Sequence, residues 1–441
     1  MTLDRNDHAD GYRGIWFRLG QFAGEYGDKY SGGLGTYTMK HVPMAVHAEG
    51  TTFFTYGGTR RDERDLLIMA GAYHHEEHAV SRPTVVDTKP EPNPSYDSET
   101  VVDPHDNATI AIDGEGHVVV FVAGRGRSRP GRIYRSDEPY SVSSFSYVTE
   151  REFFAYPQPW WIEDRFVVLF TIYDEDGNRE LFWDRTPDGR PGDPTHLVGI
   201  GGHYQISTVD EGTVYTAFNW HPDGDVDRRT NLYVLTTDDG ETWRTVSDAS
   251  VDPPISDVDH HALAWDAAAD GRLVYLNDIA VDDDGRPVVL YVTSDGPEPG
   301  PENDPRYWEL ARWTGETWNR QRITDADHNY DSGSLYLTED GWYVLGPTEV
   351  GPQPYGTGGE VACWRSTDMG GSWDRIHRLT ADSEYNHTYV RRPHDNAAPF
   401  DAFWADGDPY AASPSRLYIG SLDGRCWRLP TSMAADRVEL G

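Results

Sequence analysis

The chain has 441 residues, of which 74 are acidic and 38 are basic, so its formal net charge is −36. This acidity excludes binding to DNA or to an anionic membrane through the general surface, and no run of apolar residues is long enough for a transmembrane helix. Hydrophobic residues reach only 37%, but 15 Trp and 26 Tyr can still build a core.

The basic residues are almost all arginines. Only Lys29, Lys40 and Lys89 are lysines. A large acidic excess with little lysine is typical of proteins that work in molar salt, where charge repulsion is screened beyond about 3 Å and carboxylates keep the surface hydrated. We therefore expect a protein from a halophile such as an archaeon. An ordinary acidic protein is the alternative.

Cysteines and the N-terminal segment limit the cellular setting. Cys363 and Cys426 form neither a disulfide framework nor a zinc-ribbon pattern. The polar start MTLDRNDHADGYRG lacks the apolar region of a signal peptide. We expect a monomer in the cytoplasm of a high-salt organism, or an extracellular protein if an export signal is missing from this sequence.

Short strand patterns closed by Asp-Gly turns follow one another along the chain. Turns such as DGEG, DEDGN and DDDGR separate these Val-, Tyr- and Phe-rich runs. The runs lie at 117–124, 165–173, 213–218, 272–281, 286–294 and 334–346. No segment has a convincing helical period, so the pattern predicts an all-β protein.

Two segments repeat one turn motif. TTDDGETW (236–243) and STDMGGSW (366–373) fit S/T-x-D-x-G-x-x-W, the Asp-box or BNR repeat of β-propellers. The hairpin groups predict a single domain, 1–441, that is a seven-bladed β-propeller, with six blades as the alternative. The expected blades are 41–100, 105–150, 155–200, 203–252, 258–322, 328–380 and 386–430. GYRGIWF (11–17) is expected to complete a blade and so close the ring.

Polar clusters recur where the expected blades begin, close to the propeller axis. Six clusters contribute a histidine: His41, His105, His203, His221, His328 and His387. For each histidine alone, a hydrogen-bonding role between blades is as plausible as a functional one. A transition metal held by imidazoles is an alternative, although no HxH or HExxH spacing occurs and the metal is unknown. We expect no cofactor for the chemistry, and we consider a structural Ca²⁺ on the axis without assigned ligands.

The segment GRGRSRPGRIYRS (124–136) places five arginines within eleven residues of an acidic chain. Arginine binds a carboxylate or a sulfate bidentately. We expect Arg125, with Arg127 beside it, to face an acidic ligand, and Arg132 and Arg135 to pair with the protein's own acids. Tyr156 lies in YPQPWW, whose tryptophans could stack against a sugar, so the ligand that fits is an acidic sugar.

A uronic acid undergoes β-elimination when three groups act on it. A cation neutralises the C6 carboxylate, a base removes the C5 proton, and an acid protonates the leaving oxygen on C4. Arginine, histidine and tyrosine can fill these roles at neutral pH.

Longer motifs resemble the BNR-4 repeat family over nearly the whole chain. They are GYRGIWF, YGDKYSGGLGTYTMKHVPMAVHA, HDNATIAIDGEGHVVVFVAGRGRSRPG, YPQPWW, GGHYQIS and YVRRPHDNAAPFDAFWADG. The resemblance implies a seven-bladed propeller similar to three groups of enzymes that act on L-rhamnose α-1,4-linked to D-glucuronate. These are ulvan lyases of polysaccharide lyase families 24 and 25, rhamnosyl-glucuronate lyases of family 42, and glycoside hydrolase family 145 rhamnosidases.

The resemblance also implies site residues. His105 and Tyr156 match the ulvan-lyase pattern. The second histidine of that pattern, some twenty residues after the first, is replaced here by the Arg125 region. The arginine that the pattern places on the strand after the tyrosine is missing from FVVLFTIY (166–173). The cysteines and histidines of the ulvan-lyase zinc site are not evident. The KYSGGLGTYTMKH block, with His41, is instead similar to the rhamnosidase and rhamnosyl-glucuronate lyase branch, in which this histidine is a proposed catalytic residue.

We therefore expect a polysaccharide lyase that cleaves the rhamnose–glucuronate linkage by β-elimination. Its expected catalytic residues are Arg125 as the carboxylate counter-ion, His41 or His105 as the base, and Tyr156 as the acid. The expected substrate-binding residues are Arg127, Lys40, His203, Trp160, His221, Arg229, His387 and Arg391.

Three other functions stay open at this point. An α-L-rhamnosidase would hydrolyse the same linkage with two matched carboxylates, and no such pair stands out. A non-catalytic propeller would bind acidic carbohydrate without cleaving it. A sialidase would need an arginine triad, which Arg125, Arg229 and Arg391 could mimic, but no F/Y-R-I-P motif precedes the first Asp-box.

Overall fold

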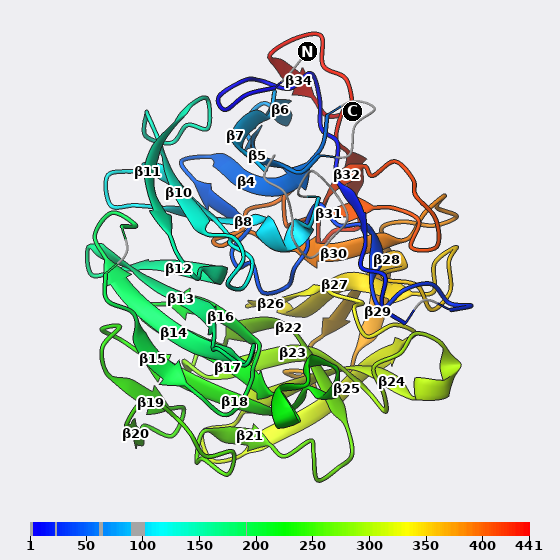
Figure 1. Cartoon of the computed structure of the whole chain (residues 1–441). Helices are drawn as coiled ribbons and strands as arrows, with labels where there is room; N and C mark the ends of the chain where they lie inside the picture. The colour runs from blue at the N-terminus through cyan, green and yellow to red at the C-terminus, as the bar shows by residue number, and fades with distance from the viewer. Residues whose placement is uncertain (1–2, 23, 61–64, 90–101, 191) are drawn as a thin grey trace.

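The computed structural model describes residues 3–22, 24–60, 65–89, 102–190 and 192–441. Seven antiparallel sheets stand around a common axis, as Figure 1 shows, which confirms the seven-bladed β-propeller over the six-bladed alternative. Part of the first expected blade, 61–64 and 90–100, lies outside the described residues. No helix among those described is long and apolar enough to span a membrane.

The first three blades take up the N-terminal half of the chain. A short hairpin, β1 (Trp16–Arg18) with β2 (Ser31–Gly33), precedes them. The first blade contains β3 (Ala45–Ala48), β4 (Thr51–Gly58), β5 (Leu67–His74), β6 (Ala79–Ser81), β7 (Thr84–Thr88) and β34 (Arg437–Glu439). The second contains β8 (Ala108–Ile112), β9 (Val118–Val122), β10 (Gly131–Ser136) and β11 (Phe145–Arg151). The third contains β12 (Ala155–Ile162), β13 (Arg165–Tyr173), β14 (Arg179–Thr186) and β15 (Thr195–Val198).

The other four blades follow in chain order. The fourth contains β16 (Gln205–Asp210), β17 (Thr213–Trp220), β18 (Thr230–Thr237), β19 (Trp243–Thr245), β20 (Ser250–Val251) and β21 (Leu263–Trp265). The fifth contains β22 (Leu273–Val281), β23 (Pro287–Ser294), β24 (Arg306–Trp313) and β25 (Trp318–Ala326). The sixth contains β26 (Ser334–Thr338), β27 (Gly341–Glu349), β28 (Glu360–Ser366) and β29 (Asp374–Arg378). The seventh contains β30 (His387–Arg391), β31 (Ala402–Asp406), β32 (Leu417–Gly420) and β33 (Cys426–Arg428). The described helical elements are 3-10 turns: η1 (Pro104–Asp106), η2 (Pro222–Gly224), η3 (Val226–Arg228) and η4 (Pro301–Asn303).

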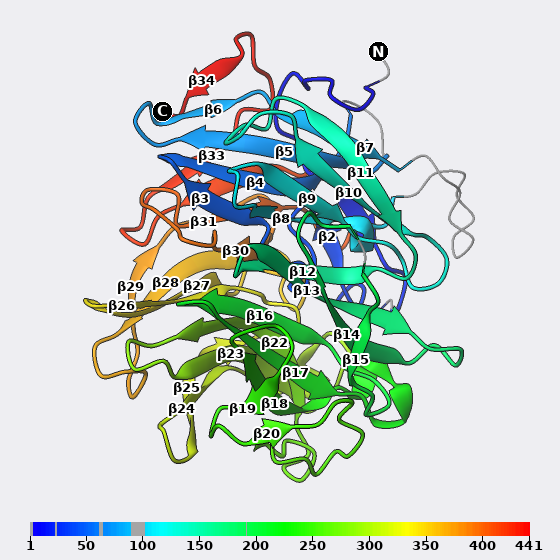
Figure 2. The ribbon, with the colours of Figure 1, turned by 90° about the vertical axis from the view of Figure 1, so that its left-hand side faces the viewer.

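The C-terminal strand closes the ring. β34 pairs with β6 of the first blade, with Val438 opposite Val80, and both ribbon views place the end of the chain beside that blade (Figures 1 and 2). The sequence-based expectation that 11–17 would complete a blade is wrong, because β1 pairs with β2 instead. Closure by β34 covers an outer edge of the first blade that would otherwise be free to pair with another chain.

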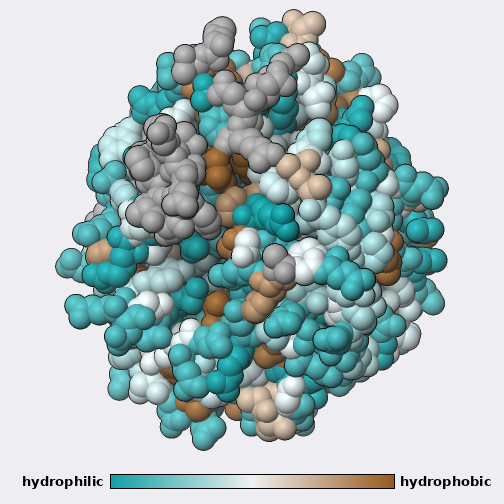
Figure 3. Space-filling view, turned by 45° about the vertical axis from the view of Figure 1, so that its right-hand side comes forward, coloured by the Kyte–Doolittle hydropathy of each residue, from teal (hydrophilic) through white to brown (hydrophobic). Residues whose placement is uncertain are grey.

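Hydrophobic cores lie between neighbouring blades. All five residues of β9 are buried, which explains why its sequence, VVVFV, is a continuous apolar run and not an alternating one. One core cluster joins the third and fourth blades through Leu169 of β13, Val214 of β17 and Tyr233 of β18. The face in Figure 3 is largely hydrophilic, as the acidic composition predicts.

Both Asp-boxes form the turn between the third and fourth strands of a blade, at 236–243 and 366–373. The Asp239 carboxylate accepts hydrogen bonds from the backbone nitrogens of Glu241 (2.7 Å) and Thr242 (2.8 Å). Gly240 has a φ of 66°, and a Cβ there would lie 2.4 Å from Val167, so the turn requires glycine. These turns lie outside the central pocket described below.

A buried loop fills the propeller axis. We call residues 37–43 the axial loop; Tyr37 to His41 are buried. Blades on different sides hold this loop by its backbone: Asn107 donates to the Tyr37 carbonyl (2.6 Å), Gln158 to that of Lys40 (3.0 Å), and Arg391 to that of Thr38 (2.9 Å). The axial loop therefore forms the floor on which a site at the axis can be built.

Candidate active site

A pocket opens at the axis where the inner strands of the blades begin. Its volume is about 690 Å³, including space that is open to solvent. The second to seventh blades, the axial loop and the β1–β2 segment all contribute side chains. The polar and aromatic lining consists of Gln21, Lys29, Tyr30, Tyr37, Thr38, Lys40, His105, Arg125, Tyr156, Arg179, Tyr204, Arg229, Tyr275, Asn277, Asn329, Tyr330, Ser332 and Tyr389.

Bulges in three inner strands point side chains at this pocket. The register shifts between Ala155 and Gln158 in β12, between Leu276 and Asp278 in β22, and between Thr388 and Arg391 in β30. Tyr156 and Tyr389 lie in two of these bulges with φ values of 52° and 49°. Left-handed backbone is strained for tyrosine, and such strain is concentrated at functional sites.

The pocket has the opposite charge character to the rest of the chain. Among the described lining residues are five cationic side chains and no Asp or Glu: Lys29, Lys40, Arg125, Arg179 and Arg229. In a protein of net charge −36, such a chamber attracts an anion and sets it against aromatic rings.

Two of the five cations already have acidic partners. Arg125 donates from Nε to Asp103 (3.1 Å), and Lys29 forms an ion pair with Asp227. In the described part of the chain, Arg179, Arg229 and Lys40 form no ion pair with an acid. These three are therefore the candidates for binding an anionic ligand.

Arg179 and Arg229 lie against tyrosine rings. The guanidinium carbon of Arg179 is 5.3 Å from the ring centroid of Tyr204, and that of Arg229 is 4.9 Å from the same centroid. Arg179 Nε is buried and has no hydrogen-bond partner in the described structure. A buried guanidinium without a carboxylate is costly, and an anionic ligand would offset that cost.

Lys40 is held at the edge of this cationic group. Its Nζ donates to the carbonyl of Leu276 (2.8 Å). Burial and the neighbouring Arg229 and Arg391 lower the pKa of the Lys40 amine well below its usual value. An anion in the pocket would favour its charged form.

A histidine–aspartate pair forms another wall of the pocket. His105 Nδ1 lies 2.5 Å from Asp103 Oδ1, and His105 Nε2 lies 2.8 Å from the Tyr37 hydroxyl and 3.0 Å from the Tyr30 hydroxyl. Burial lowers the pKa of His105, so the imidazole is neutral at neutral pH. Burial alone would raise the pKa of Asp103, but His105 and Arg125 hold it well below its usual range.

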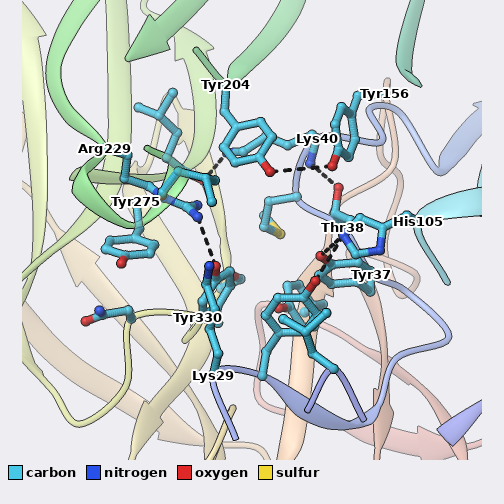
Figure 4. Close-up of a pocket in the computed structure, with 18 of the residues that line it drawn as sticks. Lys29, Tyr37, Thr38, Lys40, His105, Tyr156, Tyr204, Arg229, Tyr275 and Tyr330 are labelled. Atoms are coloured by element: carbon cyan, nitrogen blue, oxygen red, sulfur yellow. Dashed lines mark hydrogen bonds between the residues drawn. The ribbon is translucent and has the colours of Figure 1, made fainter. Parts of the chain in front are cut away.

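Two tyrosines meet beside Lys40, as Figure 4 shows. The hydroxyls of Tyr156 and Tyr204 are 3.5 Å apart. Burial would raise the pKa of Tyr204, but Arg179 and Arg229 lower it to about 8. Burial raises the pKa of Tyr156, with Tyr173 and Tyr204 adding to the rise, so Tyr156 stays protonated and can donate a proton.

Five of the sequence-predicted site residues line the pocket: His105, Tyr156, Arg125, Lys40 and Arg229. His41 does not. Its Nδ1 accepts from the Thr38 backbone nitrogen (3.1 Å), and its ring lies beside Tyr156 at a centroid distance of 5.7 Å. Arg391 also lies outside the lining, since it donates to backbone carbonyls of the axial loop. Both residues support the floor of the pocket and do not face its interior.

The other predicted binding residues have partners within the protein, away from the pocket lining. His203 contacts the Arg179 carbonyl (2.9 Å), His387 accepts from Trp404 Nε1 (2.9 Å), and His221 packs edge-on against Tyr204 at 4.9 Å. Arg127 donates to the Tyr173 carbonyl (3.1 Å), and Trp160 donates to Ser207 (2.7 Å). None of the five lines the pocket, which corrects the expectation that they face a ligand there. Four of them hydrogen-bond other segments of the protein, whereas both ring nitrogens of His221 are buried without a hydrogen-bond partner in the described structure.

The arginine cluster at 124–136 is largely neutralised by acids of the protein. Arg129 forms two hydrogen bonds to Asp106, at 2.8 and 2.9 Å. Arg132 pairs with Asp87 and Arg135 with Asp113, which confirms the expectation for both arginines. The cluster therefore contributes Arg125 to the pocket, and Arg125 is itself paired.

Sequence reasoning missed Arg179, Tyr37 and Tyr204. In the preceding strand, β13, the only arginine is its first residue, Arg165. Arg179 begins the next strand, β14, directly opposite Tyr173. In GGHYQIS (201–207) the residue that lines the pocket is Tyr204, and not the neighbouring His203 that the sequence predicted. For Arg179 and Tyr204 the signal that could have found them is an arginine or tyrosine next to the end of a blade's strand. Tyr37 has no such signal, because it lies in the axial loop.

The described residues contain no group of three His, Cys, Asp or Glu side chains placed to hold a metal ion. Cys363 and Cys426 are free thiols whose pKa burial raises to about 12. A structural Ca²⁺ on the axis stays a prediction.

Comparison with known proteins supports the fold. Residues 200–326 match the model of a BNR repeat-containing family member, which agrees with the resemblance drawn from the motifs. No curated protein sequence matches the chain.

Several solved structures share the architecture. A PL25 ulvan lyase has a TM-score of 0.74 at 13% identity, covering 90% of this chain and 96% of its own. A PL25 ulvan lyase bound to -[GlcA(1-4)Rha3S]- has a TM-score of 0.75 at 13% identity, covering 95% and 97%. The polysaccharide lyase Uly1 has a TM-score of 0.61 at 12% identity, covering 94% and 98%. The chain is thus a seven-bladed propeller with two Asp-box turns and a cationic, tyrosine-lined axial pocket. In particular, its fold is similar to that of these polysaccharide lyases.

Proposed function

We propose that this protein is a polysaccharide lyase that cleaves an acidic glycan by β-elimination at a uronate. The observation that carries the proposal is the set of three cations without acidic partners, Arg179, Arg229 and Lys40, in a pocket whose described lining has no carboxylate. A uronate carboxylate placed among them would be neutralised, which acidifies the proton on C5.

The remaining steps need a base and an acid within reach of the sugar. We assign the base to the wall that His105 forms with Asp103 and with the phenols at its Nε2; the 2.5 Å contact with Asp103 orients the imidazole. Tyr156 is the acid, because its phenol stays protonated and can donate to the leaving oxygen on C4. Arg125 supports this wall by its ion pair with Asp103. The carboxylate of the substrate would instead bind to Arg179 and Arg229.

The substrate that we propose is a glycan with L-rhamnose α-1,4-linked to D-glucuronate. Support comes from the motif resemblance and from the structurally similar PL25 ulvan lyase bound to -[GlcA(1-4)Rha3S]-. Tyrosine rings around the pocket supply flat apolar faces on which sugar rings can stack.

A rhamnosidase is less well supported by the same pocket. Hydrolysis of a glycosidic bond usually needs two carboxylates on opposite sides of that bond. The described lining provides none. Asp103, the acid directly behind the lining, is engaged by His105 and Arg125.

The test is incubation of the purified chain in high salt with ulvan and with unsulfated rhamnosyl-glucuronate oligosaccharides. A lyase produces an unsaturated uronate, whose double bond raises the ultraviolet absorbance. Its products together do not contain the extra water molecule that hydrolysis would add. Free rhamnose without that absorbance would show hydrolysis and overturn the proposal. Binding of intact oligosaccharide without any product would identify a carbohydrate-binding propeller instead.

A further inference from the structure

The imidazole of His105 is shared between a carboxylate and two phenols. Asp103 lies on its Nδ1 side at 2.5 Å, while Tyr37 and Tyr30 lie on its Nε2 side at 2.8 and 3.0 Å. All four side chains are buried, and both tyrosines line the pocket.

The contact with Asp103 decides the tautomer. Two lone pairs facing each other at 2.5 Å would repel, so Nδ1 carries the hydrogen and donates it to the carboxylate. In the neutral ring Nε2 is then an acceptor with a single lone pair. That lone pair points at the phenols, so His105 cannot itself reach a proton on a sugar while a phenol occupies it.

One lone pair cannot accept from two hydroxyls. The nearer phenol, Tyr37, is the donor to Nε2, and its ring stands nearly perpendicular to the imidazole, with an interplanar angle of 88°. Tyr37 is also firmly placed, because Asn107 binds its carbonyl at 2.6 Å and Tyr389 packs edge-on against its ring at 5.1 Å. Tyr30 keeps a hydroxyl hydrogen that it can donate to the ligand or to the Tyr37 oxygen.

We infer that Tyr37 is the group that takes the C5 proton of the uronate, with His105 and Asp103 behind it as a proton relay. This inference rests on the proposed lyase function. The arrangement follows the logic of the Ser-His-Asp triad, with a phenol in the place of the serine hydroxyl. Tyr37 is then a catalytic residue, and Asp103 is a positioning residue that holds the tautomer of His105.

The protons and bonds balance along this route. The C5–H bond breaks as its proton moves to the Tyr37 oxygen, and the Tyr37 hydroxyl proton moves to His105 Nε2. The electron pair left on C5 forms the C4=C5 double bond, the C4–O bond breaks, and Tyr156 gives its proton to the leaving oxygen. After this step Tyr37 is again a neutral phenol, His105 is an imidazolium stabilised by Asp103, and Tyr156 is a phenolate. Transfer of the one extra proton from His105 to Tyr156 restores both residues, so no oxidant or cofactor is consumed.

The paired variants Tyr37→Phe and Tyr30→Phe test this assignment, because each removes one hydroxyl beside the same nitrogen. We expect Y37F to lower kcat by about 10²–10⁴-fold, the usual worth of a general base, with KM little changed. For Y30F we expect a loss of kcat below about tenfold. Y37F turning over within tenfold of the wild type, or Y30F losing as much as Y37F, would overturn it.

Failure of this inference can be told from failure of the proposed function. A wild-type chain that makes no unsaturated product from any uronate glycan would sink both. An active wild type with an active Y37F would sink the Tyr37 assignment alone.

If Y37F does not fold, nitrogen-15 NMR of histidine-labelled wild type decides, with H105Q used to assign the signal. The relay predicts a hydrogen on Nδ1 with a low-field resonance and an unprotonated Nε2. A hydrogen on Nε2 would overturn the inference.

Discussion

Arg179 lies with its guanidinium carbon 5.3 Å from the ring centroid of Tyr204, and its buried Nε has no hydrogen-bond partner in the described structure. In a chain with 74 acidic residues, an arginine left without an acid beside a pocket indicates a site for an external anion. The sequence pointed instead to Arg125, which Asp103 already engages.

Replacing Arg179 with glutamine is expected to lower kcat/KM on a uronate glycan by about 10²–10³-fold, because one preorganised donor to the developing charge is lost. Steady-state kinetics from ultraviolet absorbance measure this loss. The matched control is Arg190→Gln, which removes an exposed arginine of the same blade that pairs with Asp188. Equal activity of R179Q and R190Q would show that Arg179 does not bind the carboxylate.

Tyr204 should make anion binding sensitive to alkaline pH. Its pKa is lowered to about 8, so it is a neutral phenol below that pH and a phenolate above it. The phenolate would pair with Arg179 and Arg229 and compete with an anionic ligand. We expect the dissociation constant for an acidic oligosaccharide, measured by calorimetry, to rise above pH 8 in the wild type and to stay flat in Y204F. A rise of the same size in Y204F would refute this role.

Ionisation of Tyr204 above pH 8 should weaken anion binding but increase the free energy of unfolding. Its pKa in the folded chain lies below 10, the ordinary value for tyrosine. The folded state is therefore stabilised as pH rises from 8 towards 10, and this contribution is lost as pH falls through 8. Equilibrium unfolding of the wild type and Y204F across this range should show the difference.

Buried histidines should destabilise the fold in mild acid. Burial lowers the pKa of His41 and His328 to about 3 and that of His203 and His387 to about 4, against 6.5 for the ordinary group. Below pH 6.5 these histidines bind protons in the unfolded chain but not in the folded chain. The free energy of unfolding therefore decreases as the pH is lowered, until the pH reaches the pKa of the histidine in the folded chain. Each such histidine contributes about 1.4 kcal/mol per pH unit in that window.

Urea unfolding at about pH 7 and about pH 5 measures this slope. The variant His387→Gln should reduce the slope by one proton and leave kcat unchanged, because His387 hydrogen-bonds Ser383 and Trp404 and does not line the pocket. A slope that H387Q leaves unaltered would mean that His387 is not buried in its neutral form.

Salt should stabilise the protein. With a net charge of −36, the compact state suffers self-repulsion that salt screens. We expect the thermal unfolding midpoint to rise between about 0.1 M and about 2 M NaCl, where the screening length falls to a few ångströms. A midpoint that stays constant or falls would argue against adaptation to high salt.

The fold was predictable because its signals are local. Each Asp-box specifies a turn through neighbouring residues, as Asp239 and Gly240 show, and apolar runs such as VVVFV mark strands buried between blades. These features repeat, so their number and spacing predict the architecture without knowledge of any long-range contact.

The site was only partly predictable because distant segments build it. His105 and Tyr156 stand in motifs that could be recognised, but Tyr37 acquires its role only when the axial loop meets the second blade. The histidines at blade starts have the right residue type in the right place, yet His203 and His387 use their nitrogens to join segments of the protein. Whether an arginine forms an ion pair with an acid of the protein depends on tertiary contacts. The sequence therefore could not show that Arg125 is paired with Asp103 or that Arg179 lies in the pocket without an acidic partner.

The central claim is β-elimination at a uronate held in the cationic pocket, and mass spectrometry of the products tests it most directly. The account predicts that wild-type protein and a rhamnosyl-glucuronate oligosaccharide give a fragment with an unsaturated uronate end, lighter by one water than the hydrolysis product, and that R179Q gives little of it. Products that all carry the added water, or unsaturated product formed as fast by R179Q as by wild type, would contradict the account.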